Sequence, residues 1–168
     1  LQTHMFDKLD PSNFQIELPD ISSGRWTLKK DSETLLRWDV DIIPDLAPIV
    51  RILTLPEVTD RAALQFVVLA DDDYGILDLK AHLSRPDSEG SFELALPFPI
   101  GSTAIESKSY HDLTAHPWAG LPVELWVVGA DHTGQLGQSK KVKITLPERE
   151  FHHPVARALA LERKQLFI

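Results

Sequence analysis

Seven short segments in which apolar and polar side chains alternate follow one another at regular spacing between residues 49 and 146. Successive side chains of a strand point to opposite faces of a sheet, so this alternation predicts strands that are buried on one face. Helical periodicity is absent from this stretch, and the connections contain turn residues such as Asp73-Tyr74-Gly75. We therefore expect an all-β fold, a seven-stranded antiparallel immunoglobulin-like sandwich. The expected strands are Ile49–Leu53, Ala62–Ala70, Ile76–Ser84, Ser91–Leu96, Thr103–Tyr110, Pro122–Val128 and Lys140–Leu146.

The core of this sandwich must be held by apolar packing alone, because the chain contains no cysteine and cannot form the disulfide that joins the two sheets of antibody domains. A chain of 168 residues is long enough to bury such a core without staples. In the third segment we expect Leu77, Leu79, Ala81 and Leu83 to face inward. The expected core comprises Phe66, Val68, Leu79, Leu94, Leu125, Val127 and Ile144.

Segments of different character flank the sandwich on both sides. Residues 1–43 contain three further strand-like segments, which predict extra N-terminal strands of a preceding module or of an extended sheet; these are Phe14–Leu18, Arg25–Lys29 and Leu36–Ile42. Two prolines in Ile43–Pro48 then interrupt the pattern, so we expect the sandwich to span residues 44–147. Residues 148–168 form the start of a helical region, with a helix expected from Pro154 to about Leu166, since proline is favoured in the first helical turn.

Charge and motifs restrict the function. The formal net charge of −8 disfavours nucleic acid and anionic lipid as partners, because binding to phosphate requires a basic surface. No run of about 18 apolar residues is present that could span a membrane. The nucleophile elbow, the phosphate-binding loop and the dinucleotide fingerprint are all missing from the sequence. We therefore do not expect an enzyme.

Five aspartates form the first candidate site: Asp45, Asp71, Asp72, Asp73 and Asp131. In a sandwich with this strand order, the entering linker and the two turns that carry these residues lie at the same end. Carboxylates that converge repel one another, and a hard cation such as calcium would relieve that repulsion. The alternative is that each aspartate accepts hydrogen bonds from its own turn, and the spacing is not that of the twelve-residue calcium loop. We therefore expect no cofactor, and calcium bound at these aspartates is the alternative.

Histidines give a weaker metal hypothesis. His111, His116, His152 and His153 could lie near one another at the opposite end of the sandwich, but their spacing does not match the zinc motif of metalloproteases. Histidines that cap turns or donate to backbone carbonyls explain the same residues.

The segment from His111 to Pro122 joins two strands and is rich in apolar and aromatic residues, which a free surface loop does not require. Trp118 is expected either to close the bottom of the sandwich and seat the C-terminal helix, or to form a partner-binding patch with His116 and Pro117. The other tryptophans, Trp26, Trp38 and Trp126, are more simply core or inter-strand residues. Binding to glycans would require an exposed row of aromatic rings.

Two longer motifs carry a family resemblance: HDLTAHPWAGLPV at residues 111–123 and LPEREFHHPVARAL at residues 146–159. Together with IPDLAP at 43–48 and ADDDYG at 70–75, they resemble an uncharacterised family of large bacterial inner-membrane proteins that carry a domain of unknown function. The likeness covers residues 38–166. It implies that this chain is a periplasmic part of a membrane-anchored protein, with immunoglobulin-like modules that lead into long helices. Transmembrane segments would then lie outside this sequence, and no catalytic residues are transferred.

Three hypotheses about function follow from these observations. The first is a non-catalytic periplasmic spacer or protein-interaction module of a membrane-anchored envelope protein, whose partners are neighbouring domains of the same chain or other envelope proteins. The second is an inter-domain junction stabilised by calcium at the five aspartates. The third is a glycan-binding module.

Overall fold

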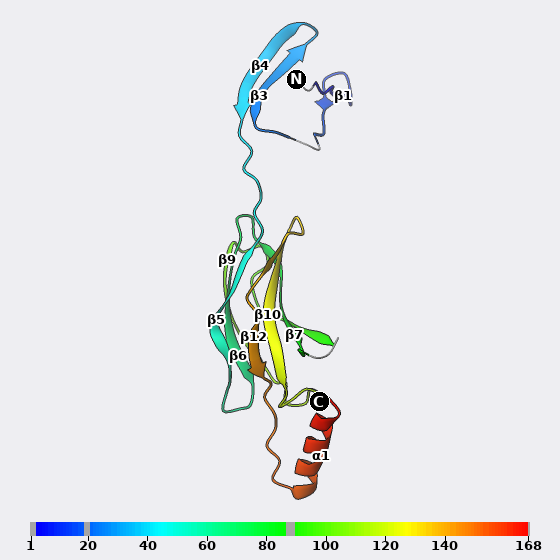
Figure 1. Ribbon diagram of the computed structural model, residues 1–168. Helices are drawn as coiled ribbons and strands as arrows, with labels where there is room; N and C mark the ends of the chain where they lie inside the picture. The colour runs from blue at the N-terminus through cyan, green and yellow to red at the C-terminus, as the bar shows by residue number, and fades with distance from the viewer. Residues whose placement is uncertain (1–2, 19–20, 87–89, 168) are drawn as a thin grey trace. The chain divides into compact units, whose positions relative to one another are not determined.

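The computed structural model describes residues 3–18, 21–86 and 90–167 and divides the chain into two compact units, Leu1–Pro44 and Asp45–Ile168 (Figure 1). Strands dominate both units, every strand pairing is antiparallel, and a short helix follows the last strand. The expectation of a mostly β, antiparallel fold with a C-terminal helix is therefore confirmed. Within the described residues, no helix has the length and apolar character needed to cross a membrane.

The first unit consists of two hairpins. Strand β1 (Asp7–Lys8) pairs with β2 (Phe14–Gln15), and β3 (Gly24–Lys30) pairs with β4 (Glu33–Val40). The turn between β3 and β4 contains two residues, of which Asp31 has φ of 53°, a left-handed conformation that aspartate tolerates well. The sequence pattern did not predict β1.

One face of the β3–β4 hairpin is apolar and uncovered. Trp26 lies opposite Trp38 and Leu28 lies opposite Leu36, so the four side chains share this face. Trp38 is 44% exposed and Leu36 is 60% exposed. None of the described residues of this unit is buried. The first unit therefore has no core of its own in the part of the chain that the structure describes.

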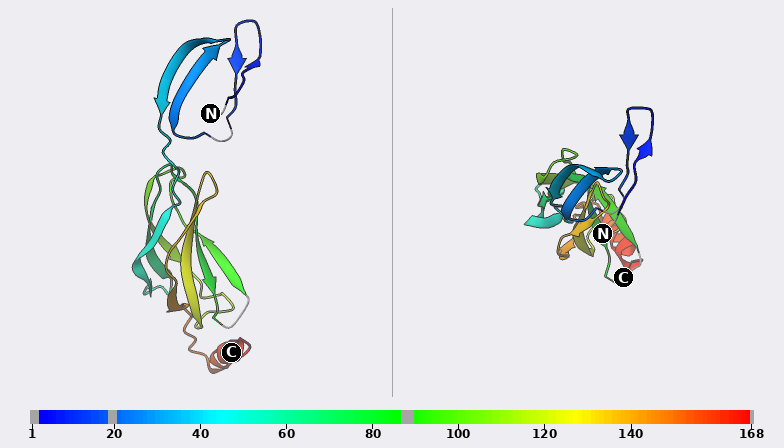
Figure 2. Two further views of the ribbon diagram at one scale, coloured as in Figure 1. Left: turned by 45° about the horizontal axis from the view of Figure 1, so that its top comes forward. Right: turned by 90° about the horizontal axis from the view of Figure 1, so that it is seen from above.

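The second unit contains two sheets. In the first sheet the order is β5-β6-β9, and in the second it is β8-β7-β10, with β11 and β12 both paired to β10. Figures 1 and 2 show these strands gathered in two layers. The strands are β5 (Ile49–Val58), β6 (Leu64–Asp71), β7 (Ile76–Ser84), β8 (Ser91–Ala95), β9 (Ala104–His111), β10 (Pro122–Asp131), β11 (Leu136–Gln138) and β12 (Val142–Thr145).

Both sheets contribute to one apolar core. Phe66 and Val68 from β6 and Leu79 from β7 belong to the same buried cluster as Leu125 and Val127 from β10. These five residues were expected in the core and are fully buried. The two remaining members of the expected core are only partly buried and pack against the cluster; they are Leu94 and Ile144.

The inward direction expected for Leu77 is wrong. The register between β10 and β7 shifts after Ala130, so that Asp131 pairs with Ile76 and Leu77 is passed over. Such an irregularity turns the skipped side chain outward and brings its neighbour inward. Leu77 is therefore 47% exposed, whereas Ile76 is buried.

The last expected strand, Lys140–Leu146, contains β12. A short strand that the pattern did not predict, β11, precedes it and also pairs with β10. Between them, Ser139 replaces part of the ladder: its N–H donates to the Val127 carbonyl (2.9 Å), and its Oγ accepts the Val127 N–H (2.9 Å). A side chain thus satisfies a buried backbone donor where the strand breaks.

Candidate functional site

The lower end of the second unit contains the candidate site that we call the Trp118 corner: the loop of residues 112–121, the segment of residues 147–153 and helix α1 (Pro154–Gln165). The loop is a series of tight turns, with the His116 N–H bonded to the Leu113 carbonyl (3.0 Å) and the Ala119 N–H to the His116 carbonyl (2.9 Å). The Gly120 N–H then donates to the Leu146 carbonyl (3.0 Å), which fixes the loop to the end of β12. The loop is therefore rigid, although it is long.

Trp118 is only 9% exposed and packs inside this corner. Its ring centroid lies 5.4 Å from Phe92 and 5.3 Å from His116, and His116 lies 4.1 Å from Phe92. The backbone N–H of Trp118 donates to His116 Nδ1 (3.1 Å), so Nδ1 must be unprotonated. Burial lowers the pKa of His116, which favours the same neutral form.

Helix α1 is attached to the corner through its C-terminal half. Arg163 Nη2 donates to the Ala119 carbonyl (2.6 Å), and Lys164 Nζ lies 2.8 Å from one Glu148 oxygen and 2.6 Å from the other. Phe167 packs against the core cluster, and the Arg85 guanidinium lies 6.0 Å from its ring centroid. A helix of twelve residues is marginal alone in water, so these contacts hold it in place.

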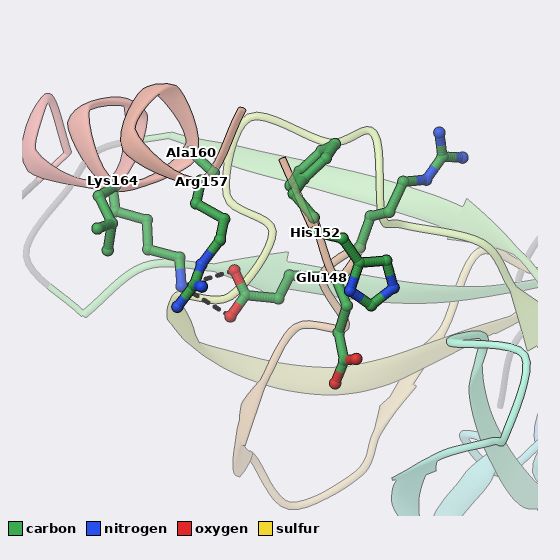
Figure 3. A pocket seen from close by; sticks show the side chains of 9 residues that line it. Glu148, His152, Arg157, Ala160 and Lys164 are labelled. Atoms are coloured by element: carbon green, nitrogen blue, oxygen red, sulfur yellow. Dashed lines mark hydrogen bonds and ion pairs between the residues drawn. The ribbon is translucent and has the colours of Figure 1, made fainter. Parts of the chain in front are cut away.

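Two shallow pockets lie beside the helix. Figure 3 shows the first, a cavity of about 380 Å³ in which Lys164 reaches across to Glu148. The second, of about 270 Å³, shares Phe151 and Ala160 with the first and is lined by apolar residues apart from Arg163. No serine, threonine or cysteine lines either pocket, so neither holds a hydroxyl or thiol nucleophile. The first cavity is lined by Glu148, Arg149, Glu150, Phe151, His152, Arg157, Ala160, Leu161 and Lys164.

Two of the five aspartates meet at the opposite end of the second unit. Thr133 Oγ1 lies 2.8 Å from Asp45 Oδ2 and 2.9 Å from Asp131 Oδ1, so its one proton can go to either carboxylate. Asp131 Oδ1 also accepts from the backbone N–H groups of Thr133 (2.8 Å) and Gln135 (2.9 Å). Burial by itself would raise the pKa of Asp131, but the hydrogen bonds to its carboxylate have the larger effect, so the pKa lies below its usual value.

The other three aspartates lie at the end of β6 and in the turn that follows it. Asp72 Oδ2 accepts from the Gly75 N–H (2.6 Å), and Asp73 Oδ1 lies 3.4 Å from the Leu46 N–H. Asp71 is exposed at the end of β6. The described residues include no three histidine, cysteine, aspartate or glutamate side chains placed to hold one ion. Hydrogen bonding within their own turns therefore accounts for one carboxylate oxygen of Asp72 and one of Asp131.

The four histidines have separate environments. His111 stacks on Phe66 with ring centroids 5.9 Å apart, and burial lowers its pKa. His116 belongs to the aromatic cluster of the Trp118 corner, His152 lines the larger cavity, and His153 is the residue immediately before α1.

Several residues of these sites were not predicted. Thr133 and Gln135 hold Asp45 and Asp131, and the pattern Asp131-His132-Thr133 is typical of a turn in which a hydroxyl and a carboxylate share donors. Arg163 and the Glu148–Lys164 pair have no such signal, because they depend on where the helix docks.

The fold and the sites define a β-rich protein of two units whose pockets contain no assigned reaction centre. The sequence from residue 2 to residue 168 matches the family model described as "Domain of unknown function (DUF4175)". The chain belongs to this family. No curated protein matches the chain.

Proposed function

We propose that this chain is a non-catalytic periplasmic spacer or protein-interaction module of a membrane-anchored envelope protein. The observation that carries the proposal is the uncovered apolar face of the β3–β4 hairpin, where Leu36 and Trp38 are exposed. A two-stranded hairpin is marginally stable by itself in water, and a partner that covers its apolar face would stabilise it. The periplasmic location follows from the family resemblance of the motifs at residues 111–123 and 146–159.

We also propose that the second unit is an immunoglobulin-like sandwich. Its first, second and fifth strands share one sheet, and its third, fourth and sixth strands share the other. In constant-type antibody domains the fourth strand joins the sheet of the first strand, whereas here it joins the sheet of the third strand. We therefore compare the second unit with immunoglobulin-like sandwiches in general and not with antibody domains. A sandwich of this kind suits a spacer, because its core is self-contained.

The outer side of α1 supports an interaction role. Ala156 and Ala160 face the rest of the unit and are half-buried. Val155, Leu159 and Leu166 recur at spacings of four and seven on the adjoining side of the helix, and all three are exposed. The helix therefore presents an apolar side that the described residues leave open.

A pair of photo-crosslinking variants tests the interaction role in the full-length protein in its membrane. A photoreactive residue replaces Leu36 on the apolar face of the hairpin, and in the control it replaces Arg37 on the polar face. We expect a defined protein adduct from position 36 and none from position 37. Equal labelling at both positions, or none at position 36, would contradict the proposal. Protection of this region from protease in intact cells, lost in spheroplasts, tests the periplasmic location.

The calcium-stabilised junction is the second candidate. One carboxylate oxygen of each of Asp45, Asp72 and Asp131 is buried without a hydrogen-bond partner among the described residues. A cation bound there would compensate for this loss of solvation. The glycan-binding hypothesis has less support, because only Trp38 among the four tryptophans is exposed and Trp126 is covered by His82 and Lys141.

A further inference from the structure

Strand β9 is an edge of its sheet, and the backbone groups on its free side have no hydrogen-bond partner among the residues that the structure describes. It pairs with β6 along its whole length with no register shift. The Asp72 N–H donates to the Thr103 carbonyl (2.9 Å), so these two residues form a hydrogen-bonded pair just before β9 begins. Hydrogen-bonded and non-hydrogen-bonded pairs alternate along an antiparallel ladder, so the odd-numbered residues of β9 bond to β6. The N–H and C=O groups of the even-numbered residues from 104 to 110 therefore point away from β6. Among the described residues, no other strand pairs with this edge.

The other edges of the second unit are irregular. Strand β5, at the far side of the same sheet, has two register shifts and contains Pro56. Strand β8 has five residues, and the β11–β12 edge is broken at Ser139. Irregularity, proline and short length are three of the features by which proteins prevent unwanted strand pairing, and charged edge residues are a fourth. Strand β9 has none of the first three, and the exposed side chains of Glu106 and Lys108 on its outer face have opposite charges.

We propose that β9 pairs antiparallel with β9 of a second copy of this chain about a two-fold axis. Only even-numbered residues offer free backbone groups, so an even-numbered residue must lie opposite an even-numbered residue. An axis at Ser107 meets this condition and places Glu106 opposite Lys108 of the partner subunit, twice by symmetry. An axis at residue 106 would place two glutamates opposite each other, and an axis at residue 108 would place two lysines there. Of these three central registers, the charges on the edge therefore favour the one with its axis at Ser107.

This register is complementary on both faces. On the outer face it forms two pairs of opposite charge and places Tyr110 opposite Ala104 of the partner subunit. On the inner face the axis passes between the two Ser107 residues, each of which is small, buried and hydrogen-bonded through Oγ to the Pro97 carbonyl of its own subunit (2.7 Å). The two three-stranded sheets then form one continuous sheet. This self-association goes beyond the role proposed above and does not depend on it, since it uses only the second unit.

Charge reversal with rescue tests this interface. Sedimentation equilibrium of the chain is expected to show a species of twice 18.9 kDa as the concentration rises. Glu106→Lys or Lys108→Glu alone should weaken the dimer at least about tenfold, because each single reversal places two like-charged pairs across the axis. The double variant Glu106→Lys/Lys108→Glu restores opposite charges and should restore the dimer. Glu57→Lys on the opposite edge of the same sheet makes the same charge change and should have no effect.

Hydrogen exchange locates the contact. The amides of residues 106 and 108 should become protected only as the dimer forms, whereas the Ser107 amide is already protected by β6. Circular dichroism of each variant confirms that the fold is retained. A chain that stays monomeric up to about 1 mM would overturn the proposal, because that limit corresponds to a binding free energy weaker than about −4 kcal/mol. A dimer that is unaffected by Glu106→Lys would also overturn it and would place the contact elsewhere, for example on the β3–β4 hairpin.

Discussion

The Ser139 side chain offers the sharpest test of how the second unit is held together. Its Oγ accepts the N–H of Val127, a residue with no exposed surface, at the point where β11 ends. Ser139→Ala removes this acceptor and little volume, so it leaves a buried N–H without a partner. Such a group costs about 1–3 kcal/mol of unfolding free energy. For a chain of this size, each kcal/mol corresponds to about 2–4 °C in Tm.

Ser109 provides the matched control. It is as buried as Ser139 and also lies in the second unit, but its Oγ has no hydrogen-bond partner among the described residues. Ser109→Ala therefore removes a buried polar atom that gains nothing, and we expect a Tm that is unchanged or higher. Calorimetry and urea denaturation of the two variants measure the difference directly. Equal destabilisation by both substitutions would refute the reasoning, because it would show that the hydrogen bond to Val127 does not matter.

Three further predictions concern packing, pH and calcium. Gly137→Ala would bring a Cβ within 1.8 Å of the Pro48 carbonyl oxygen, and we expect urea denaturation to show a loss of about 1–3 kcal/mol; an unchanged midpoint would contradict this contact. Burial lowers the pKa of His111 and His116, so the unfolded chain binds protons at these two residues more readily than the folded chain. The folded state therefore keeps its full stability above about pH 6.5, the usual pKa of histidine, and loses stability as the pH falls through the lowered pKa values. Thermal melts should therefore give a lower Tm at about pH 5.5 than at about pH 7.5, and equal values would be inconsistent with it. Because no three described side chains share one ion position, we expect the same Tm in calcium and in a chelator. A free energy of unfolding that increases by about 2.7 kcal/mol at a calcium concentration of 100 times the dissociation constant would instead support the junction hypothesis.

Much of the β structure could be predicted because alternation records which face of a strand is buried. All seven expected segments of the second unit contain a strand, and Phe66, Leu79 and Leu125 lie in the core as expected. The error at Leu77 has a local cause, since a bulge shifts the alternation by one residue and leaves no mark in composition. The short β11 was missed because Gly137 interrupts the apolar pattern there.

The hairpin of the first unit shows a different limit. The pattern Leu36, Trp38 and Val40 correctly indicates a strand with one apolar face, and Trp26 pairs across from Trp38. The sequence cannot say what covers that face, because covering depends on other segments. The sites have the same limit: Asp45 and Asp131 were expected to converge and do meet through Thr133, whereas the seat of α1 depends on Arg163, which no motif marks.

The irregular course of β5 has a consequence for how many chains can join. A sheet that can accept a neighbour on both sides can extend without limit into a filament, whereas one that accepts a neighbour on a single side cannot. The register shifts and Pro56 close one side of the β5-β6-β9 sheet. Pairing through β9 would therefore stop at two molecules, because this sheet offers no second regular edge for further strand addition.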